Sequence, residues 1–276
     1  MLAACEPSPD AAPSASPDTV AVTLSSLDPE SVPYDLSAPD VIFELPPELT
    51  EISGLTVLSS GHVGAVQDED GVLFEIDAQT GRVLSKEGFG DDGDYEGIEA
   101  TPDALWVLES NGDLYRIQRA GRALETEVFE TDLSGRNDAE GLGYDAAGDR
   151  LLVALKEHPG KGLGRVRSVF AFDLATNTLS DAPVFTLDRA IIDTGSSPFK
   201  TSAIAVRPGT DEAYLLSSVA KALLVVGLDG TIRAAVSLPV GLYRQPEGIA
   251  FAPDGTLFIS NEGAGASATL LRFSPR

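Results

Sequence analysis

Five polar residues along the chain begin similar segments, and each is followed by a small residue. The five pairs are Ser53-Gly54, Glu96-Gly97, Glu140-Gly141, Ser202-Ala203 and Glu247-Gly248. If these segments are equivalent units of one fold, three carboxylates and two hydroxyls come together. Converging carboxylates repel one another unless a cation lies between them, and a ligand set made only of oxygen favours calcium. We therefore expect Glu96, Glu140 and Glu247 to bind Ca²⁺.

A structural role for the same glutamates is the alternative. Each carboxylate can accept backbone N–H bonds from a neighbouring unit and so lock one unit to the next, and such a device would repeat along the chain as these glutamates do. Serine at two of the five positions, Ser53 and Ser202, makes the set asymmetric, which is typical of a binding site. The sequence leaves both interpretations open.

The spacing of these residues indicates which elements position them. The intervals are 43, 44, 62 and 45 residues, and each unit contains short apolar runs separated by Gly, Pro and Asp turns. A period of about 40–45 residues made of short strands is typical of a propeller blade with four strands. Two inserted loops, at residues 160–164 and 191–199, lengthen the third interval. A β-sandwich, the alternative fold, would need no fixed period.

The last unit lacks a fourth strand, because the chain stops at Arg276. An apolar run that no unit uses, residues 41–45, precedes the first unit. If this N-terminal strand completes the last blade, the ring closes and no sheet edge stays free. We therefore predict an all-β fold over residues 41–276, a five-bladed β-propeller with four-stranded blades whose last blade is closed by the N-terminal strand.

In such a propeller the loops on one face of the ring surround the mouth of the central channel. The residues that we expect at this rim, as ligands or ligand-binding groups, are Ser53, Ser202, Lys156, His158, Arg244 and Glu262. The basic residues can neutralise the carboxylates or hold an anionic ligand, and ion pairing on an acidic surface is the alternative. The imidazole can act as a general base or ligand, or belong to a loop without function.

The start of the chain differs from the rest in composition. Residues 1–40 contain seven of the 18 prolines and no basic residue, so residues 6–40 are expected to form a disordered tether. Within residues 1–5, Leu2-Ala3-Ala4-Cys5 has the form of a lipobox at the end of a signal peptide. We expect lipidated Cys5 to anchor the protein to a bacterial membrane, on the periplasmic or cell-surface side. A chance Ala-rich start is the alternative.

Composition excludes several classes of protein. The formal net charge is −24, with 43 acidic and 19 basic residues, so nucleic acid is not an expected partner. No apolar run approaches the roughly 20 residues of a membrane-spanning helix. Cys5 is the single cysteine, which excludes an internal disulfide framework. We expect the protein to be a monomer.

The order of the motifs resembles the SdiA-regulated family of bacterial envelope β-propellers. The matching elements run from Ser53-Gly54-Leu55 through the Glu-Gly motifs to Gln245-Pro246-Glu247-Gly248-Ile249, and they include the pair Lys156-Glu157. The resemblance implies a five-bladed propeller with a calcium site, and a distant similarity to NHL-repeat and phytase-like propellers. It implies the same three glutamates as ligands, with Glu157 next.

These expectations combine into one main functional hypothesis. The chain is expected to be a lipid-anchored envelope propeller that binds calcium at the channel mouth, together with a small ligand or an envelope protein. The alternative is a calcium-dependent hydrolase of phosphoesters or lactones, in which the ion activates water. An acidic rim disfavours anionic substrates. A structural scaffold in an envelope assembly is the third hypothesis.

Overall fold

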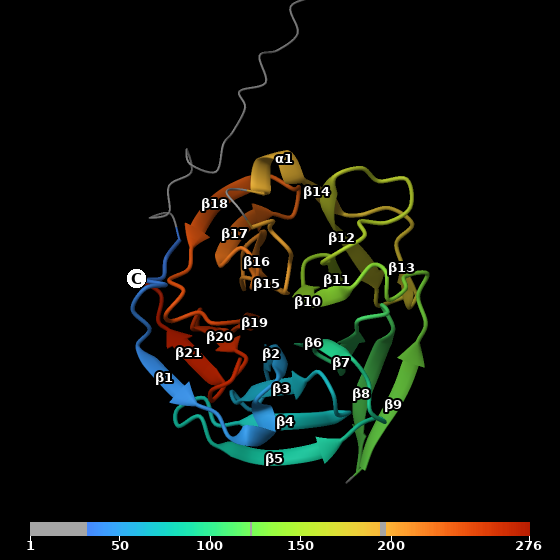
Figure 1. Ribbon diagram of the computed structural model, residues 1–276. Helices are drawn as coiled ribbons and strands as arrows, with labels where there is room; N and C mark the ends of the chain where they lie inside the picture. Colours follow the sequence, from blue (N-terminus) through green and yellow to red (C-terminus); the bar gives the residue numbers. More distant parts are fainter. Residues whose placement is uncertain (1–31, 122, 194–196) are drawn as a thin grey trace, which may run out of the picture.

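The computed structural model describes residues 32–121, 123–193 and 197–276. Five antiparallel sheets stand around a central channel, and the chain visits them in order (Figure 1). Each sheet begins with its innermost strand and proceeds outward, except in the last sheet, whose outermost strand comes from the N-terminal part of the chain. The five-bladed β-propeller predicted from the repeat is therefore confirmed.

The first two blades have four strands each. Blade 1 consists, from the axis outward, of β2 (Ile52–Val57), β3 (Val63–Gln67), β4 (Val72–Ile76) and β5 (Val83–Gly88). Blade 2 consists of β6 (Tyr95–Ala100), β7 (Leu105–Glu109), β8 (Leu114–Ala120) and β9 (Ala123–Phe129).

The third blade departs from this pattern at its outer edge. Its strands are β10 (Ala139–Asp145), β11 (Arg150–Leu155), β12 (Val166–Asp173), β13 (Thr178–Leu179) and β14 (Phe185–Asp188). Both β13 and β14 pair with β12, so the outer strand is divided in two. A short helix, α1 (Arg189–Ile192), follows it.

The last two blades again have four strands each. Blade 4 consists of β15 (Ala203–Val206), β16 (Glu212–Ser217), β17 (Ala222–Gly227) and β18 (Ile232–Ser237). Blade 5 consists of β19 (Pro246–Phe251), β20 (Leu257–Asn261), β21 (Thr269–Phe273) and β1 (Val41–Glu44).

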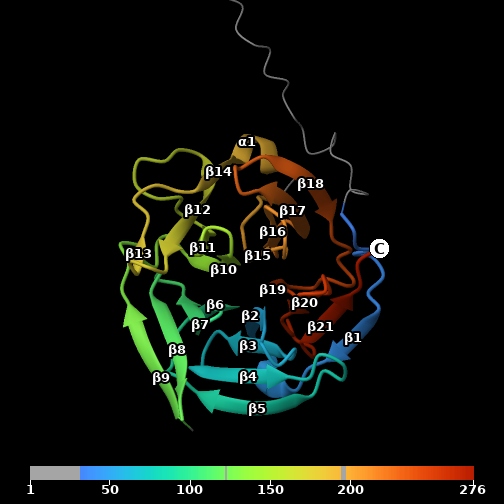
Figure 2. The ribbon, with the colours of Figure 1, turned by 180° about the vertical axis from the view of Figure 1, so that it is seen from behind.

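The N-terminal strand closes the ring, as predicted. β1 pairs antiparallel with β21, with Ile42 opposite Leu271 and Glu44 opposite Thr269. Both views of the ribbon show β1 at the outer side of β21, next to the C-terminus (Figures 1 and 2). The pairing satisfies backbone groups that would otherwise form a free sheet edge.

Small residues let the inner strands of neighbouring blades approach closely. A Cβ atom added at Gly54 would lie 2.8 Å from the backbone N of Ile98, and one at Gly97 would lie 2.8 Å from Cβ of Leu142. Real Cβ atoms do not come this close to such neighbours, so a larger residue would push the blades apart. The small residue after each repeated polar residue is therefore a requirement of the ring.

Part of the expected tether packs against the propeller. Val32, Tyr34 and Leu36 are buried, with exposed fractions of 2%, 3% and 4%. The Tyr34 hydroxyl donates to the carbonyl of Gly255 at 2.7 Å, and the Tyr243 hydroxyl donates to that of Leu36 at 2.9 Å. Val32, Tyr34 and Leu36 belong to one hydrophobic cluster with buried residues of blades 4 and 5, and this burial of apolar surface explains the packing.

Residues 1–31 lie outside the described part of the chain, and with them lie Cys5 and most of the expected tether. None of the helices among the described residues is long and apolar enough to cross a membrane.

Candidate functional site

The repeated polar residues lie at irregularities of the inner strands. In β2, β6, β10 and β19 the pairing register shifts by one residue, and the extra residue is in turn Ser53, Glu96, Glu140 and Glu247. A β-bulge leaves its extra residue unpaired in the ladder and re-aims the side chain. The fifth residue, Ser202, stands directly before β15. The bulges therefore turn one residue of each of four blades toward the channel.

These residues surround a very small cavity on the axis of the propeller. Ser53, Glu96, Glu140 and Glu247 line it, together with the small and apolar residues that follow them in their strands. Its volume of about 10 Å³ is close to the space that one water molecule needs. At this level the channel can hold a single water molecule or a monatomic ion.

A lysine compensates one of the glutamates. Lys156 follows β11 and forms an ion pair with Glu140, whose side chain is only 3% exposed. Burial opposes the charge of Lys156, but Glu140, Asp138 and Glu247 outweigh burial and raise the pKa of the lysine. Burial raises the pKa of Glu140 above its ordinary value, and the lysine limits this shift. Lys156 is thus a cation that the chain itself supplies to the acidic ring.

The other two glutamates have strongly perturbed ionisation. Burial, followed by the charges of Glu140 and Asp94, holds the pKa of half-buried Glu96 far above the ordinary range. Burial also raises the pKa of Glu247, while Lys156 and hydrogen bonds from Ser218 and Gln245 oppose the shift. In the absence of an added cation, the carboxyl group of Glu96 therefore holds its proton at neutral pH, and that of Glu247 is shifted in the same direction.

Two further carboxyl groups, those of Glu262 and Asp68, lie near the same mouth. Burial and the charges of Glu247 and Asp68 raise the pKa of Glu262 to about 8. Burial and the charges of Glu51 and Glu69 raise the pKa of Asp68 to about 6. One carboxylate oxygen of Asp68, Oδ1, is buried without a hydrogen-bond partner among the described residues. A buried acceptor without a donor is costly, so this atom marks a place where a cation or water would be stabilised.

The two serines are used differently from the glutamates. Ser53 donates its hydroxyl hydrogen to the carbonyl of Tyr95 at 2.6 Å, and Ser202 donates to that of Pro246 at 2.8 Å. Each bond joins the inner strand of one blade to the start of the next. The serines therefore act as the blade locks that the structural interpretation assigned to the glutamates, whereas the partner of Glu140 is Lys156.

The remaining predicted residues lie outside the inner ring. Glu157 pairs with Lys200, and its side chain is 44% exposed. His158 accepts a hydrogen bond from the backbone N–H of Gly160 at 3.2 Å and lines a pocket on blade 3. Arg244 lines a separate pocket of about 250 Å³ beside Glu262. The structure thus brings together Glu96, Glu140, Glu247, Lys156 and Glu262.

The donor chemistry of the mouth fits a hard cation, but its ligands are not gathered around one point. Within the described ranges, no three His, Cys, Asp or Glu side chains are close enough together to hold a metal ion. The groups that face the cavity are oxygen donors, and Oδ1 of Asp68 has no partner. A metal ion here would need the carboxylates of Glu96 and Glu247 to approach it. Calcium binding stays a prediction.

A further glutamate of β6, half-buried Glu99, lies toward the opposite end of the channel and was not among the expected site residues. It lines a pocket of about 810 Å³, and its carboxylate accepts a hydrogen bond from the Thr56 hydroxyl at 2.9 Å. Burial raises its pKa to about 7. No sequence signal marked it, because the bulge at Glu96 that changes which residues of β6 face the axis depends on the partner strand and not on residue type.

Solved structures share the fold at low sequence identity. The chain is similar to the glutaminyl cyclase of Myxococcus xanthus, with a TM-score of 0.60, 16% identity, and coverage of 86% of this chain and 95% of that one. A luciferin-regenerating enzyme gives a TM-score of 0.55 at 11% identity, with 86% and 95% covered. The PQQ-bound aldose sugar dehydrogenase of Streptomyces coelicolor gives 0.51 at 14% identity, with 87% and 100% covered. At these identities the similarity shows the fold alone.

No functionally curated protein matches the sequence. A family model does: the model described as SdiA-regulated matches residues 44–264, which is most of the propeller, from the end of β1 to the loop after β20. The match spans all of the repeated motifs and the three ring glutamates. This chain belongs to the SdiA-regulated family.

Proposed function

We propose that the channel mouth binds one divalent cation, with calcium preferred, and releases protons when it does so. The observation that carries the proposal is that Glu96, Glu140 and Glu247, from three blades, all line one cavity of about 10 Å³. Such a cavity fits a monatomic ion and is too small for an organic ligand. The outer carboxyl groups of Asp68 and Glu262 add further oxygen donors beside it.

The raised pKa values explain the coupling to protons. A carboxyl group with a raised pKa holds its proton at a pH where an exposed carboxyl group is ionised. A cation that takes the place of these protons stabilises the ionised form, so its affinity rises with pH. Calcium accepts irregular oxygen surroundings, whereas magnesium requires an almost ideal octahedron. The asymmetric arrangement of the mouth favours calcium for this reason.

The test is calorimetric titration of calcium into the chelator-treated full chain at pH 6 and pH 8, in buffers with different ionisation enthalpies. Binding should be tighter at pH 8 and should release protons. Glu96→Gln and Glu247→Gln should each weaken binding at least about tenfold, whereas Glu125→Gln, a change on the exposed strand β9, should not. If calcium does not bind at either pH, or if the ring variants bind it as the parent does, the proposal is wrong.

A hydrolase remains the alternative expectation, without an observation that favours it. The titles of the similar structures name enzymes, but at 16% identity or less they speak only for the fold. The inner cavity has no room for a phosphoester or a lactone. The acidic surroundings also repel a phosphoester. We therefore favour cation binding over hydrolysis as the function of the channel mouth.

We further propose that the protein is attached to a bacterial envelope membrane through lipidated Cys5. The support is the motif Leu2-Ala3-Ala4-Cys5, followed by a Pro-rich segment. About 25 residues between Cys5 and the packed Val32 would let the propeller stand away from the membrane and meet a small ligand or an envelope protein. Membrane fractionation of the parent and of Cys5→Ser tests this, and a variant that stays in the membrane fraction would contradict it.

A further inference from the structure

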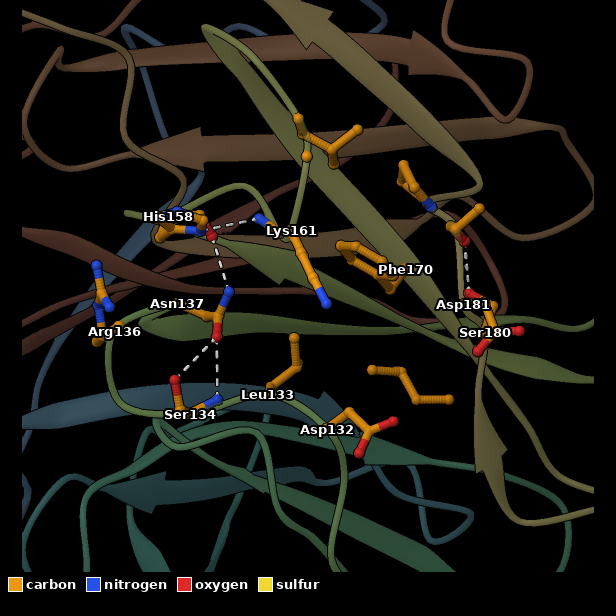
Figure 3. A pocket seen from close by; sticks show the side chains of 16 residues that line it. Asp132, Leu133, Ser134, Arg136, Asn137, His158, Lys161, Phe170, Ser180 and Asp181 are labelled. Carbon is orange, nitrogen blue, oxygen red and sulfur yellow. Dashed lines mark hydrogen bonds between the residues drawn. The ribbon is translucent and has the colours of Figure 1, made fainter.

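A pocket of about 630 Å³ opens on blade 3, and its lining includes none of the ring glutamates. It lies between the segment 132–137, the loop 158–163 and the divided outer edge of the blade, where residues 180–183 interrupt the outer strand. Figure 3 shows the side chains that surround it. Its size is in the range of pockets that hold small organic ligands, about 300–1,000 Å³.

One wall of the pocket is apolar and rigid. Phe170 of β12 forms its centre, with Leu133, Leu163 and Leu179 around it. Gly160 has a φ of +112°, and a Cβ at this position would lie 3.0 Å from Cζ of the Phe170 ring. The loop thus needs glycine to pass so close to the aromatic side chain, which holds the two elements in contact.

Hydrogen bonds join the two segments that form the rim. Asn137 is 8% exposed, and its side chain donates to the carbonyl of His158 at 3.0 Å and accepts from the backbone N–H of Ser134 at 3.0 Å (Figure 3). On the other side of the loop, the Ser168 hydroxyl donates to the carbonyl of Pro159 at 2.6 Å. The rim is therefore formed before any ligand arrives, which lowers the entropic cost of binding.

The charges at the rim distinguish this pocket from the channel mouth. Arg136 and Lys161 line it as exposed cations, and neither forms an ion pair among the described residues. Ten of the 18 basic residues that the structure describes form an ion pair with a carboxylate, and Arg136 and Lys161 are among the eight that do not. Asp132 and Asp181 also line the pocket, but unpaired acidic residues are the rule here. Arg136 and Lys161 thus leave their charges available to a ligand beside the apolar wall.

We propose that this pocket binds an amphipathic organic anion. The apolar body lies against Phe170, and the anionic head lies between Arg136 and Lys161. Because His158 accepts from the N–H of Gly160 through Nδ1, its neutral ring carries the hydrogen on Nε2 and offers a further donor. A carboxylate and a phosphate share the chemistry that these three side chains recognise. The site is independent of the proposed cation site on the axis.

The experiment compares ligands with the same apolar body and different heads. Octanoate, octyl phosphate and octylamine are titrated into the full chain by calorimetry, and hexanoate measures the effect of body length. We expect at least one of the two anions to bind at least tenfold more tightly than octylamine. The tighter of the two identifies the preferred head. Octanoate should exceed hexanoate by about tenfold, since each buried methylene adds about 0.8 kcal/mol.

Variants locate the binding. Arg136→Gln with Lys161→Gln, two exposed substitutions, should weaken binding of the preferred anion at least tenfold. Arg82→Gln, which removes another exposed arginine remote from this pocket, should leave binding unchanged. The proposal fails if octylamine binds as tightly as the anions, if neither anion binds, or if Arg82→Gln has the effect of the rim variants.

Discussion

At the scale of single residues, the pKa of each carboxyl group at the channel mouth depends on which cation or hydrogen-bond donor replaces the water that burial removes. Glu140 has Lys156 as an ion-pair partner, and Glu247 has polar hydrogen-bond donors. Among the described residues Glu96 forms no ion pair and no side-chain hydrogen bond, and Lys156 acts on it only through its charge. Their unequal surroundings give unequal pKa values, although the three residues occupy equivalent places in the repeat. Equivalence in sequence therefore does not make them equivalent in chemistry.

Removal of Lys156 should show how strongly the pKa of Glu140 depends on this cation. In Lys156→Gln the buried carboxyl group of Glu140 loses its cation, so its pKa rises further above the unfolded value. A raised pKa in the folded state makes stability fall as the pH rises toward that pKa. We expect a loss of about 3 kcal/mol in the free energy of unfolding at pH 8, and a clearly smaller loss at pH 5, where Glu140 can take up a proton.

Urea unfolding of the chelator-treated protein at both pH values measures this difference. Lys161→Gln is the matched control, because Lys161 is exposed and has no ion-pair partner among the described residues. A loss of the same size at pH 5 and pH 8 would show that Lys156 acts by packing alone and not through the charge of Glu140.

At the scale of elements, the sequence predicted the blades well and the site less well. The repeat of about 40–45 residues and the unassigned run at residues 41–45 were enough for the blade number and for ring closure. The β-bulges at Ser53, Glu96, Glu140 and Glu247 could not be predicted, because a two-to-one register depends on the partner strand and not on residue type. The ion pair of Lys156 with Glu140 could not be predicted either, because only the folded blade brings these two residues together.

Other differences have the same cause. Glu157 follows Lys156 directly, yet it pairs with Lys200 at the surface, because the chain bends at these two residues after the end of β11. Val32 and Tyr34 are buried although they lie among prolines and acidic residues, a composition that is typical of disorder.

The close contact of inner strands makes a further prediction. Gly97→Ala places a Cβ 2.8 Å from Cβ of Leu142 and 3.2 Å from its backbone N, in the next blade. Neither atom lies at the end of a flexible side chain, so blades 2 and 3 must separate. We expect a loss of about 1–3 kcal/mol in the free energy of unfolding, measured in urea. Gly135→Ala is the control, because no atom lies within 4 Å of its added Cβ. Equal stability of the two variants would contradict the crowding.

At the scale of the whole molecule, the ring of blades is closed by the pairing of the N-terminal strand with the C-terminal strand. β1 supplies the outer strand of blade 5, whose other three strands come from the last part of the chain. The preceding segment adds to this, since Tyr34 lies 6.3 Å from Tyr214 of blade 4 and 6.1 Å from Phe251 of blade 5, between ring centroids. The N-terminal segment therefore fastens two blades as well as closing a sheet.

Truncation separates these contributions. A chain that begins at residue 32 keeps every described contact and should unfold at the same temperature as the full chain. A chain that begins at residue 46 lacks both β1 and the packed segment, which leaves the edge of β21 free and removes the cover of Tyr214. We expect its midpoint to fall by more than about 10 °C, and we expect it to self-associate through the free edge as its concentration rises. Circular dichroism and size-exclusion chromatography measure both effects. An unchanged midpoint in the shorter chain would mean that blade 5 is stable with three strands and that ring closure contributes little to the fold.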